Sequence, residues 1–304
     1  MIAVIGLGAM GMGTARALLD KGLPVRGYDI NADARARFVA AGGQSADSIA
    51  EAVQGASAIL VIVVNAAQVE TVIFGEQGIL SVADTLGPNP VILQNATVPP
   101  EYAAALPARL PASLAVLDAP ISGGAVKARS GELSVMASGT PIAFARAATA
   151  LEAMAATVHH LGEHCGPGSS VKLVNQMLAG VHIAAAAEGM ALGIRMGIDP
   201  QTLYQVITHS AGNSWMFENR MEHVLEGDYQ PRSAVDIFVK DLGIVTETGR
   251  SLRFPLPLSA AAQQQFTAAA AAGLGREDDA AVIKVYEKLS GIHLPQAAND
   301  EREQ

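Results

Sequence analysis

The stretch from Met1 to Asp29 places the strongest constraint on what this chain can fold into. Residues 2 to 5 form a short apolar run that leads into Gly6-Leu7-Gly8-Ala9-Met10-Gly11, and a helical pattern follows as far as Lys21-Gly22. A second apolar run, Val25 to Tyr28, ends at Asp29. Strand, glycine turn, helix, strand and acid in this order are typical of a dinucleotide-binding unit in a doubly wound α/β sheet. The sequence predicts such a unit at the N-terminus.

Each part of this unit has a physical role toward a dinucleotide. Gly6 makes the tight turn, Gly8 lets the backbone approach a pyrophosphate, and Gly11 lets the helix pack closely on the strand. The helix N-terminus supplies amide donors and a positive dipole to the phosphates, so all six residues of the turn are predicted cofactor contacts. Asp29 is placed to accept from both ribose hydroxyls and to repel a 2′-phosphate, which favours NAD over NADP.

The alternation of strands and helices continues as far as residue 162. Apolar runs of strand length are suited to parallel strands that are buried on both faces. We expect two later strands to close the sheet around a helix at 142–155. The predicted strands after the first two are 58–64, 91–93, 115–118, 133–138 and 158–161.

After residue 162 the pattern becomes helical throughout. The fold class is therefore predicted as α/β followed by all-α, with a Rossmann domain at 1–162, an all-helical substrate and oligomerisation domain at 163–296, and a polar tail at 297–304. The helical periods cover 166–196, 200–211, 217–226, 235–251, 256–272 and 278–289.

Three predicted strand ends carry polar residues of interest. Asn65 follows the run at 58–64, at the edge where a doubly wound sheet holds its ligand. Thr97 precedes a proline and a helix; it either caps that helix or touches the nicotinamide end of a cofactor, and the two roles are compatible. Ser122-Gly123-Gly124 open a helix and present free amides to an anion such as a carboxylate, with a plain turn as the alternative.

The helix predicted at 166–196 is apolar around most of its circumference, so we expect it to be buried. Lys172 and Asn175 are three residues apart and share one face. A buried ammonium is costly and its pKa falls toward neutrality, which is the condition for proton transfer; the alternative is a lysine that reaches solvent from the first turns. His182 and Glu188 on the same helix are expected to be buried, hydrogen-bonded polar groups.

Composition excludes several classes of function. The net charge is −9 with no Lys/Arg cluster, which argues against nucleic acid or a membrane surface as partner. A single cysteine, Cys165, indicates a reducing compartment. Met1 leads directly into an apolar strand without the basic segment of a signal peptide. We expect no apolar stretch to be long enough to span a membrane, so a cytoplasmic protein is predicted.

A metal site and a cysteine nucleophile are not expected. Four possible metal ligands lie close together in the sequence: His159, His160, His164 and Cys165. His159 and His160 are adjacent at a predicted strand end, so their side chains point to opposite faces. The sequence has no second pair of ligands at the spacing of a zinc site. Nothing near Cys165 reads as an orienting base.

Two later segments combine polar and apolar residues in unusual ways. Asn213-Ser214-Trp215 holds the one tryptophan of the chain among small polar residues, which suits either a pocket wall or a helix start. Lys240 and Asp241 lie in an apolar helical pattern. Adjacent helical positions do not face each other, so no self-contained ion pair is expected, and Lys240 reaches a ligand or a distant carboxylate unless it lies at the surface.

Four motifs together resemble the β-hydroxyacid dehydrogenase family, which includes 3-hydroxyisobutyrate dehydrogenase, tartronate semialdehyde reductase and 6-phosphogluconate dehydrogenase. They follow one another in the family's order and span nearly the whole chain. The motifs are Gly6-Leu7-Gly8-Ala9-Met10-Gly11, Asp118-Ala119-Pro120-Ile121-Ser122-Gly123-Gly124, Gly168-Ser169-Ser170-Val171-Lys172-Leu173-Val174-Asn175, and Lys240-Asp241-Leu242.

The resemblance implies a Rossmann domain, a long interdomain helix and an all-α domain that often forms an oligomer, a dimer or a tetramer. It implies oxidation of a hydroxy acid with NAD, and it assigns a role to each matching residue. Lys172 would be the general acid/base, Asn175 the substrate-orienting neighbour, Ser122, Gly123 and Gly124 the carboxylate contacts, and Thr97 and Lys240 cofactor contacts.

Within the family, residues 213–220 and 232–241 most resemble members that oxidise the C2 hydroxyl of a four-carbon sugar acid, and Trp215 is a substrate-binding candidate there. Gln94-Asn95-Ala96-Thr97 departs from the commoner Ser/Cys-Ser-Thr form of its loop. D-Erythronate, 3-hydroxyisobutyrate and tartronate semialdehyde or glycerate are alternative substrates. A protein of another class, an NAD-binding sensor without chemistry, leaves Lys172, Asn175 and the serine-glycine motif without a purpose.

Overall fold

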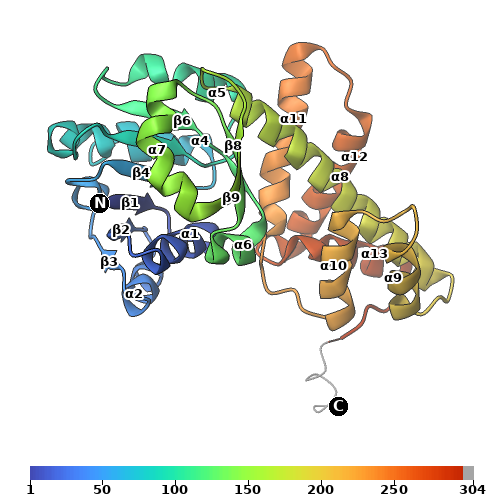
Figure 1. Cartoon of the computed structure of the whole chain (residues 1–304). Helices are drawn as coiled ribbons and strands as arrows, with labels where there is room; N and C mark the ends of the chain where they lie inside the picture. The colour runs from blue at the N-terminus through green and yellow to red at the C-terminus, as the bar shows by residue number, and fades with distance from the viewer. Residues whose placement is uncertain (297–304) are drawn as a thin grey trace. The chain divides into compact units, whose positions relative to one another are not determined.

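The computed structural model describes residues 1–296, and the predicted polar tail at 297–304 lies outside the described residues. The chain folds into two compact units, Met1–Leu173 and a second that begins at Val174. The first is a Rossmann unit and the second is helical, which confirms the predicted fold class (Figure 1).

The Rossmann unit is built on a six-stranded sheet in the order β3-β2-β1-β4-β5-β6. Every neighbouring pair is parallel, and the strand order reverses on either side of β1, which is the arrangement that creates a ligand crevice at the carboxyl edge. The strands are β1 (Ile2–Ile5), β2 (Val25–Tyr28), β3 (Gln44–Ser45), β4 (Ala58–Val61), β5 (Val91–Gln94) and β6 (Ala115–Asp118).

Both faces of this sheet are covered, which explains why its strands read as continuous apolar runs. Ile2 and Val4 of β1 pack into one buried cluster, while Ala3 and Ile5 pack into another on the opposite face. Successive side chains of a strand alternate between faces, so a strand covered on both sides must be apolar at every position. Figure 1 shows helices on either side of the sheet.

The helices divide between the two faces according to the cluster they join. The first face holds α1 (Ala9–Asp20), α2 (Ala32–Ala40), α6 (Gly124–Ser130) and α7 (Pro141–Met154), and the second holds α3 (Ile49–Val53), α4 (Ala66–Phe74), η1 (Ile79–Thr85) and α5 (Pro100–Ala105), with η2 (Pro107–Arg109) following α5.

The strands after β6 do not close the main sheet as expected. They form a separate sheet in the order β7-β8-β9, with β7 antiparallel to β8 and β8 parallel to β9. An isolated bridge between Asp118 and Ser138 links the two sheets. The pairs Asp118–Ser138, Ile121–Val135 and Ser122–Ser134 share one antiparallel register, so the chain runs on from β6 into β7 and reverses direction between β7 and β8. Strand β8 is therefore antiparallel to β6 and cannot continue the parallel ladder. The second sheet consists of β7 (Ile121–Ser122), β8 (Leu133–Ala137) and β9 (Ala155–His160).

The second unit consists of helices around one buried cluster, as the helical periods predict. The long helix α8 (Pro167–Arg195) begins in the first unit and continues into the second. The other helices are α9 (Pro200–Thr208), α10 (Trp215–Glu226), α11 (Val235–Leu252), α12 (Pro257–Ala269), η3 (Ala270–Leu274), η4 (Asp279–Ile283) and α13 (Lys284–Ser290).

Helix α8 is less buried than its composition suggests. By length and composition alone it could span a membrane, whereas no stretch of that kind is predicted in the sequence analysis. Half of its most apolar stretch is buried inside the protein, as in the core helix of a globular domain. His182 and Glu188 were expected to be buried and are exposed. Glu188 accepts from the Tyr286 hydroxyl at 2.9 Å. Small alanines make the inward face of α8, so the polar side chains point outward.

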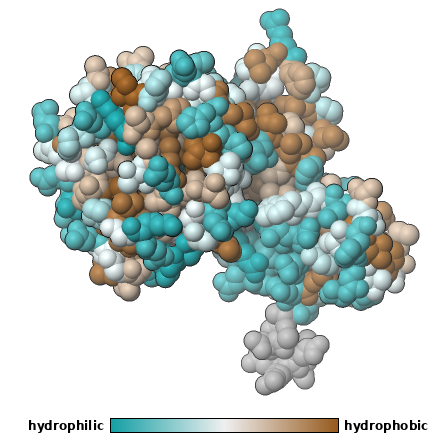
Figure 2. Space-filling view, viewed as in Figure 1, coloured by the Kyte–Doolittle hydropathy of each residue, from teal (hydrophilic) through white to brown (hydrophobic). Residues whose placement is uncertain are grey.

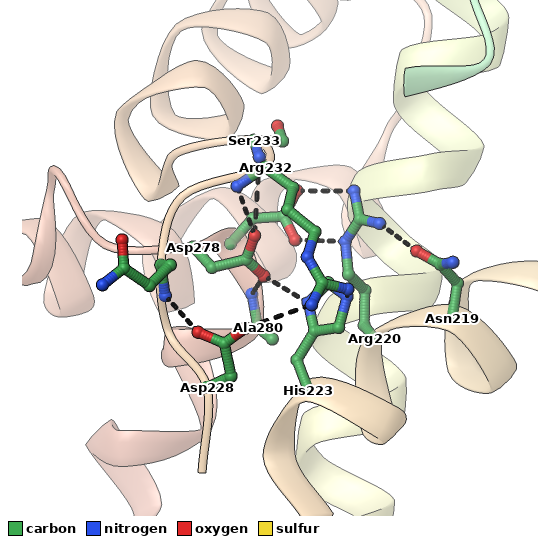
Figure 3. Close-up of polar contacts among 10 residues, drawn as sticks. Asn219, Arg220, His223, Asp228, Arg232, Ser233, Asp278 and Ala280 are labelled. Atoms are coloured by element: carbon green, nitrogen blue, oxygen red, sulfur yellow. Dashed lines mark hydrogen bonds and ion pairs between the residues drawn. The ribbon is translucent and has the colours of Figure 1, made fainter. Parts of the chain in front are cut away.

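A buried polar network joins α10, the segment just before α11, and η4 with its N-cap Asp278 (Figure 3). The Arg220 guanidinium donates to both carboxylate oxygens of Asp279, at 2.5 and 3.1 Å. His223 Nδ1 lies 3.0 Å from Oδ1 of Asp278, and its Nε2 faces the Arg232 guanidinium. Because a guanidinium can only donate, Nε2 of His223 accepts and Nδ1 donates to Asp278. Arg220 is therefore a structural residue of the helical unit.

Candidate active site

The glycine turn after β1 has the shape that a pyrophosphate requires. Gly6 has φ +97°, and a Cβ there would lie 2.2 Å from the carbonyl oxygen of Ile62. A Cβ on Gly11 would lie 1.8 Å from the carbonyl oxygen of Gly6. Gly8 faces open space, and the N-terminus of α1 receives no side-chain cap. The turn is thus a cradle with free amide donors at a helix start, which fits a dinucleotide phosphate.

Asp29 stands at the end of β2, beside the glycine turn. Its Oδ2 accepts from the Leu7 amide at 2.6 Å and its Oδ1 from the Asn31 amide at 2.8 Å. Each carboxylate oxygen has a second lone pair, so both can still accept from a ribose hydroxyl. The bond to Leu7 fixes the acid against the turn that would hold the phosphates.

Two strand-end residues have defined structural partners. Asn65 caps α4, where its side chain accepts from the Gln68 amide at 2.9 Å. Thr97 does not cap the following helix, because α5 begins at Pro100 with Pro99 as an N-cap that makes no side-chain bond. The capping alternative for Thr97 was therefore wrong. A cofactor contact by either residue stays a prediction.

Asn95, the departure from the common family loop, joins two strand ends. Its Nδ2 donates to the carbonyl oxygen of Ala119 at 2.6 Å, across a separation of 24 residues. Its buried Oδ1 finds no partner among residues 1–296. The loop that carries Thr97 is thereby tied to the segment that leads from β6 to Ser122.

The serine-glycine motif forms a tight turn at the start of α6. Ser122 ends β7, Gly123 is the N-cap of α6 with φ +132°, and Gly124 has φ +75°. A Cβ on Gly123 would also lie 3.0 Å from Cβ of Lys127. Both glycines adopt conformations that disfavour other residues, and α6 receives no side-chain cap. The turn therefore leaves backbone donors beside the Ser122 hydroxyl.

Asp118, the last residue of β6, accepts hydrogen bonds from the start of α8. This role is not predicted by the sequence analysis. Its Oδ2 accepts from the amides of Gly166 at 3.0 Å and Ser169 at 2.8 Å, and its Oδ1 accepts from the Ser169 hydroxyl at 2.7 Å. Burial raises the pKa of Asp118, although the hydrogen bonds from Ser169, Gly166 and Ser138 act in the opposite direction. The sequence holds one signal for this role: an aspartate ends the predicted strand 115–118, just before the turn predicted to bind an anion.

Lys172 is the sixth residue of α8 and is only 7% exposed. The structure therefore excludes a lysine that simply extends into solvent. Nearby Cys165 is also buried, and burial raises the pKa of its thiol to about 11. The thiolate is the nucleophilic form of cysteine, and a raised pKa disfavours it at neutral pH.

In the helical unit, Asn175 and Lys240 connect to the same buried carboxylate. Asn175 Nδ2 donates to Gln176 Oε1 at 2.9 Å, and Gln176 Nε2 donates to Asp241 Oδ2 at 2.5 Å. Lys240 Nζ lies 2.7 Å from Asp241 Oδ1. The expectation that Lys240 and Asp241 do not pair was wrong, because the long lysine stem folds back to a carboxylate that is buried and needs a cation.

Trp215 begins α10, so the segment 213–215 is a helix start, with Ser214 as the cap. Trp215 is 58% exposed. A cavity of about 330 Å³ in the helical unit is lined by Asn213, Ser214 and residues of α8 and α9. None of the predicted catalytic or carboxylate-binding residues lines this cavity.

The described residues contain no metal centre of the usual kind. Among residues 1–296, no group of three or more His, Cys, Asp and Glu side chains is placed to share a metal ion. His160 instead stacks on Phe144, with ring centroids 4.2 Å apart.

Two protein-family models match the chain. The NAD binding domain of 6-phosphogluconate dehydrogenase matches residues 1–162. A model described as the NAD-binding domain of NADP-dependent 3-hydroxyisobutyrate dehydrogenase matches residues 166–286. The first match ends before α8, and the second contains the whole of that helix.

Similar proteins align over nearly the full chain. An L-threonate dehydrogenase of Cupriavidus necator is 54% identical, and one of Escherichia coli K12 is 51% identical, each over 97% of this chain and 97% of the relative. A crystal structure of a 3-hydroxyisobutyrate dehydrogenase from Salmonella typhimurium is 51% identical with a TM-score of 0.87, and the match covers 93% of this chain and 99% of the other. The chain therefore belongs to the β-hydroxyacid dehydrogenase (3-hydroxyisobutyrate dehydrogenase-like) family and is an NAD-dependent hydroxyacid dehydrogenase.

Proposed function

We propose that this protein oxidises the C2 hydroxyl of L-threonate, a four-carbon sugar acid, to give 2-dehydro-L-erythronate with NAD as acceptor. The relatives from Cupriavidus necator and Escherichia coli carry the name L-threonate dehydrogenase. The structural observation that carries the chemistry is the burial of Lys172 on a helix whose first turn is bonded to Asp118, four residues before Ser122. The end of β6 is thus linked to the proposed base by hydrogen bonds and to the proposed anion-binding turn by the chain itself.

The glycine turn and Asp29 would hold the cofactor. The amides at the start of α1 suit its phosphates, and the Asp29 carboxylate suits its ribose hydroxyls. When bound, NAD supplies an acceptor for the hydride that leaves C2. Asn65, Thr97 and Lys240 are proposed as further contacts.

Lys172 would take the proton of the C2 hydroxyl as the hydride leaves. This step requires the neutral amine. In the reverse direction the ammonium would return the proton to the carbonyl oxygen. A single side chain therefore serves as base and acid.

The substrate carboxylate would bind the Ser122 hydroxyl and the backbone amides of Gly123 and Gly124. Fixing the carboxylate sets which carbon faces the cofactor and the base. Asn175 shares the helix face of Lys172 and would orient the hydroxyl. Its bond to Gln176 holds the amide in one rotamer. Trp215 is proposed as part of the substrate-binding wall.

The test is NADH formation with a panel of hydroxy acids: L-threonate, D-erythronate, 3-hydroxyisobutyrate, glycerate and tartrate. L-Threonate is expected to give the highest kcat/KM. We expect Lys172→Met to bind NAD as the wild type does while kcat falls by about 10³-fold or more, as is usual for loss of a general base. Turnover near wild type in that variant would exclude Lys172 as the base.

A second candidate substrate is 3-hydroxyisobutyrate, favoured by the name of the Salmonella structure at 51% identity. The same panel separates the two, because 3-hydroxyisobutyrate lacks the C2 hydroxyl and must present its C3 hydroxyl to Lys172. NAD binding without turnover of any panel member would indicate the non-catalytic sensor instead.

A homo-oligomer, a dimer or a tetramer, is proposed as the working form in the cytoplasm. Large apolar side chains lie exposed on the helical unit, among them Leu252, Phe254 and Leu258 around the turn between α11 and α12. Figure 2 shows hydrophobic residues gathered at this part of the surface. A second copy of the chain would cover them. We further propose that 1–162 binds the cofactor and that 163–296 serves substrate binding and assembly.

A further inference from the structure

The buried carboxylate of Asp118 receives four hydrogen bonds. In addition to its bonds with Gly166 and Ser169, its Oδ2 accepts from the Ser138 hydroxyl at 3.2 Å. Ser138 itself accepts from the Gly168 amide at 2.9 Å. Two amides and a hydroxyl at the start of α8 thus bond directly to one side chain of β6, and a third amide reaches it through the serine that follows β8. These bonds tie the first turn of the helix to the strand ends.

Steric contact fixes the same turn from the other side. A Cβ at Gly168 would lie 2.4 Å from the carbonyl oxygen of Met136 and 2.8 Å from that of Asp118. The helix backbone therefore touches the backbone of two strands at this point. Hydrogen bonds and close packing thus act on the same turn of the helix, and together they fix its position against the two strands.

Lys172 follows Ser169 by three residues, which is less than one helical turn. Any movement of the first turn is therefore passed on to the lysine. The peptide chain after Asp118 leads in four residues to Ser122, and its carbonyl at Ala119 is held by Asn95. One residue is thus connected to both the proposed base and the proposed carboxylate site.

We propose that Asp118 is a positioning residue of the dehydrogenase, which sets Lys172 in register with Ser122, Gly123 and Gly124. This inference rests on the proposed function of those residues. Misplacement of a reacting group by about 1 Å can lower the rate by about 10²-fold. Asp118 acts through the helix and touches no substrate.

The hydrogen bonds of Asp118, and not its charge, carry the proposed role. Burial raises the pKa of Asp118, while the hydrogen bonds from Ser169, Gly166 and Ser138 act in the opposite direction. A side chain of the same shape that keeps a hydrogen-bonding atom at each oxygen position should therefore keep the helix start in place.

The test compares Asp118→Ala with Asp118→Asn in the full chain. In Asp118→Ala, we expect kcat per folded molecule to fall by about 10²-fold with the Kd for NAD within about twofold of wild type, because the glycine turn is intact. C2-deuterated L-threonate is expected to show a larger isotope effect on kcat, because hydride transfer becomes slower than product release.

Asp118→Asn should retain kcat within about threefold. Its amide oxygen can accept at the position of Oδ2, and its amide nitrogen can donate to the Ser169 hydroxyl oxygen. The matched control is Asp278→Asn, which alters a carboxylate that is equally buried but lies in the network of Figure 3. This control should lose stability and keep its kcat.

A folded Asp118→Ala protein with wild-type kcat and isotope effect would overturn the proposal, and so would equal losses in the Ala and Asn variants. Where the Ala variant does not fold, Ser169→Ala removes the hydroxyl that donates to Oδ1 of Asp118 and keeps the backbone amide that donates to Oδ2. A fall in kcat of about 3- to 10-fold is expected. Unchanged kcat there counts equally against the proposal. Failure of the proposed function is distinguishable, because the wild type itself would then form no NADH from L-threonate.

Discussion

Ser169 donates to Asp118 twice, through its backbone amide at 2.8 Å and through its hydroxyl at 2.7 Å. The two residues are separated by 51 positions in the sequence. This pair joins the end of β6, which leads to the proposed carboxylate site, to the start of the helix that bears Lys172.

Gly168→Ala is expected to displace the start of α8, because the new Cβ would lie 2.4 Å from a backbone oxygen of β8. We predict a fall in kcat of about 10- to 100-fold and a loss of about 1–3 kcal/mol of unfolding free energy. Steady-state kinetics and urea unfolding measure the two effects. Gly189→Ala on the same helix is the control, because its Cβ meets nothing within 4 Å, and there the change should stabilise the helix slightly.

Asp29→Asn should weaken the preference for NAD. We propose that the carboxylate accepts from the ribose and repels a 2′-phosphate. Its removal is therefore expected to lower kcat/KM for NAD and to raise it for NADP, with a combined change in the ratio of about 10²-fold. Asp33→Asn, which neutralises an exposed acid in the next helix, should leave the ratio unchanged. An unaltered ratio in Asp29→Asn would show that another group selects the cofactor.

Arg220→Met should destabilise the helical unit by about 3–5 kcal/mol, because it leaves the buried Asp279 carboxylate without its cation. The double variant Arg220→Met/Asp279→Leu is expected to recover much of this loss, since the unpaired charge is gone. Urea unfolding of the full cycle measures the coupling. Arg250→Met, which breaks an exposed pair with Glu247, should have no measurable effect. Because Arg220 lines no proposed substrate site, kcat of folded Arg220→Met should match the wild type.

Asp278 should make the protein sensitive to acid. Burial acts to raise its pKa, but hydrogen bonds from His223 and from the amides of Arg232 and Ala280 prevail and hold the pKa below its usual value. A lowered pKa contributes stability that is fully present above the unfolded value of about 3.9 and is lost as the pH falls below it. The unfolding free energy of wild type should therefore exceed that of Asp278→Asn at pH 7, and the gap should narrow toward pH 3. A gap that is constant with pH would contradict this assignment.

The local elements of the fold were determined by the sequence itself. The glycine turn between β1 and β2, the strand at 115–118 and the helices of the second unit follow from the spacing of apolar residues and from glycines that no other residue can replace. Such signals are local, because backbone sterics and alternate burial act over a few residues. The resemblance of four motifs to one family extended this reading to the reaction class, and the similar proteins confirm it.

Only the tertiary structure decided which distant residues meet. The second sheet, the pairing of Lys240 with Asp241 and the exposure of His182 all differ from expectation, because each depends on how elements pack and not on their own pattern. The hold of Asp118 on α8 is of the same kind. A buried carboxylate must be satisfied by donors, but the sequence does not say which donors the fold brings within reach. The sequence thus pointed to Lys172 as the candidate base, whereas packing at the end of β6 decided the position of the helix that bears it.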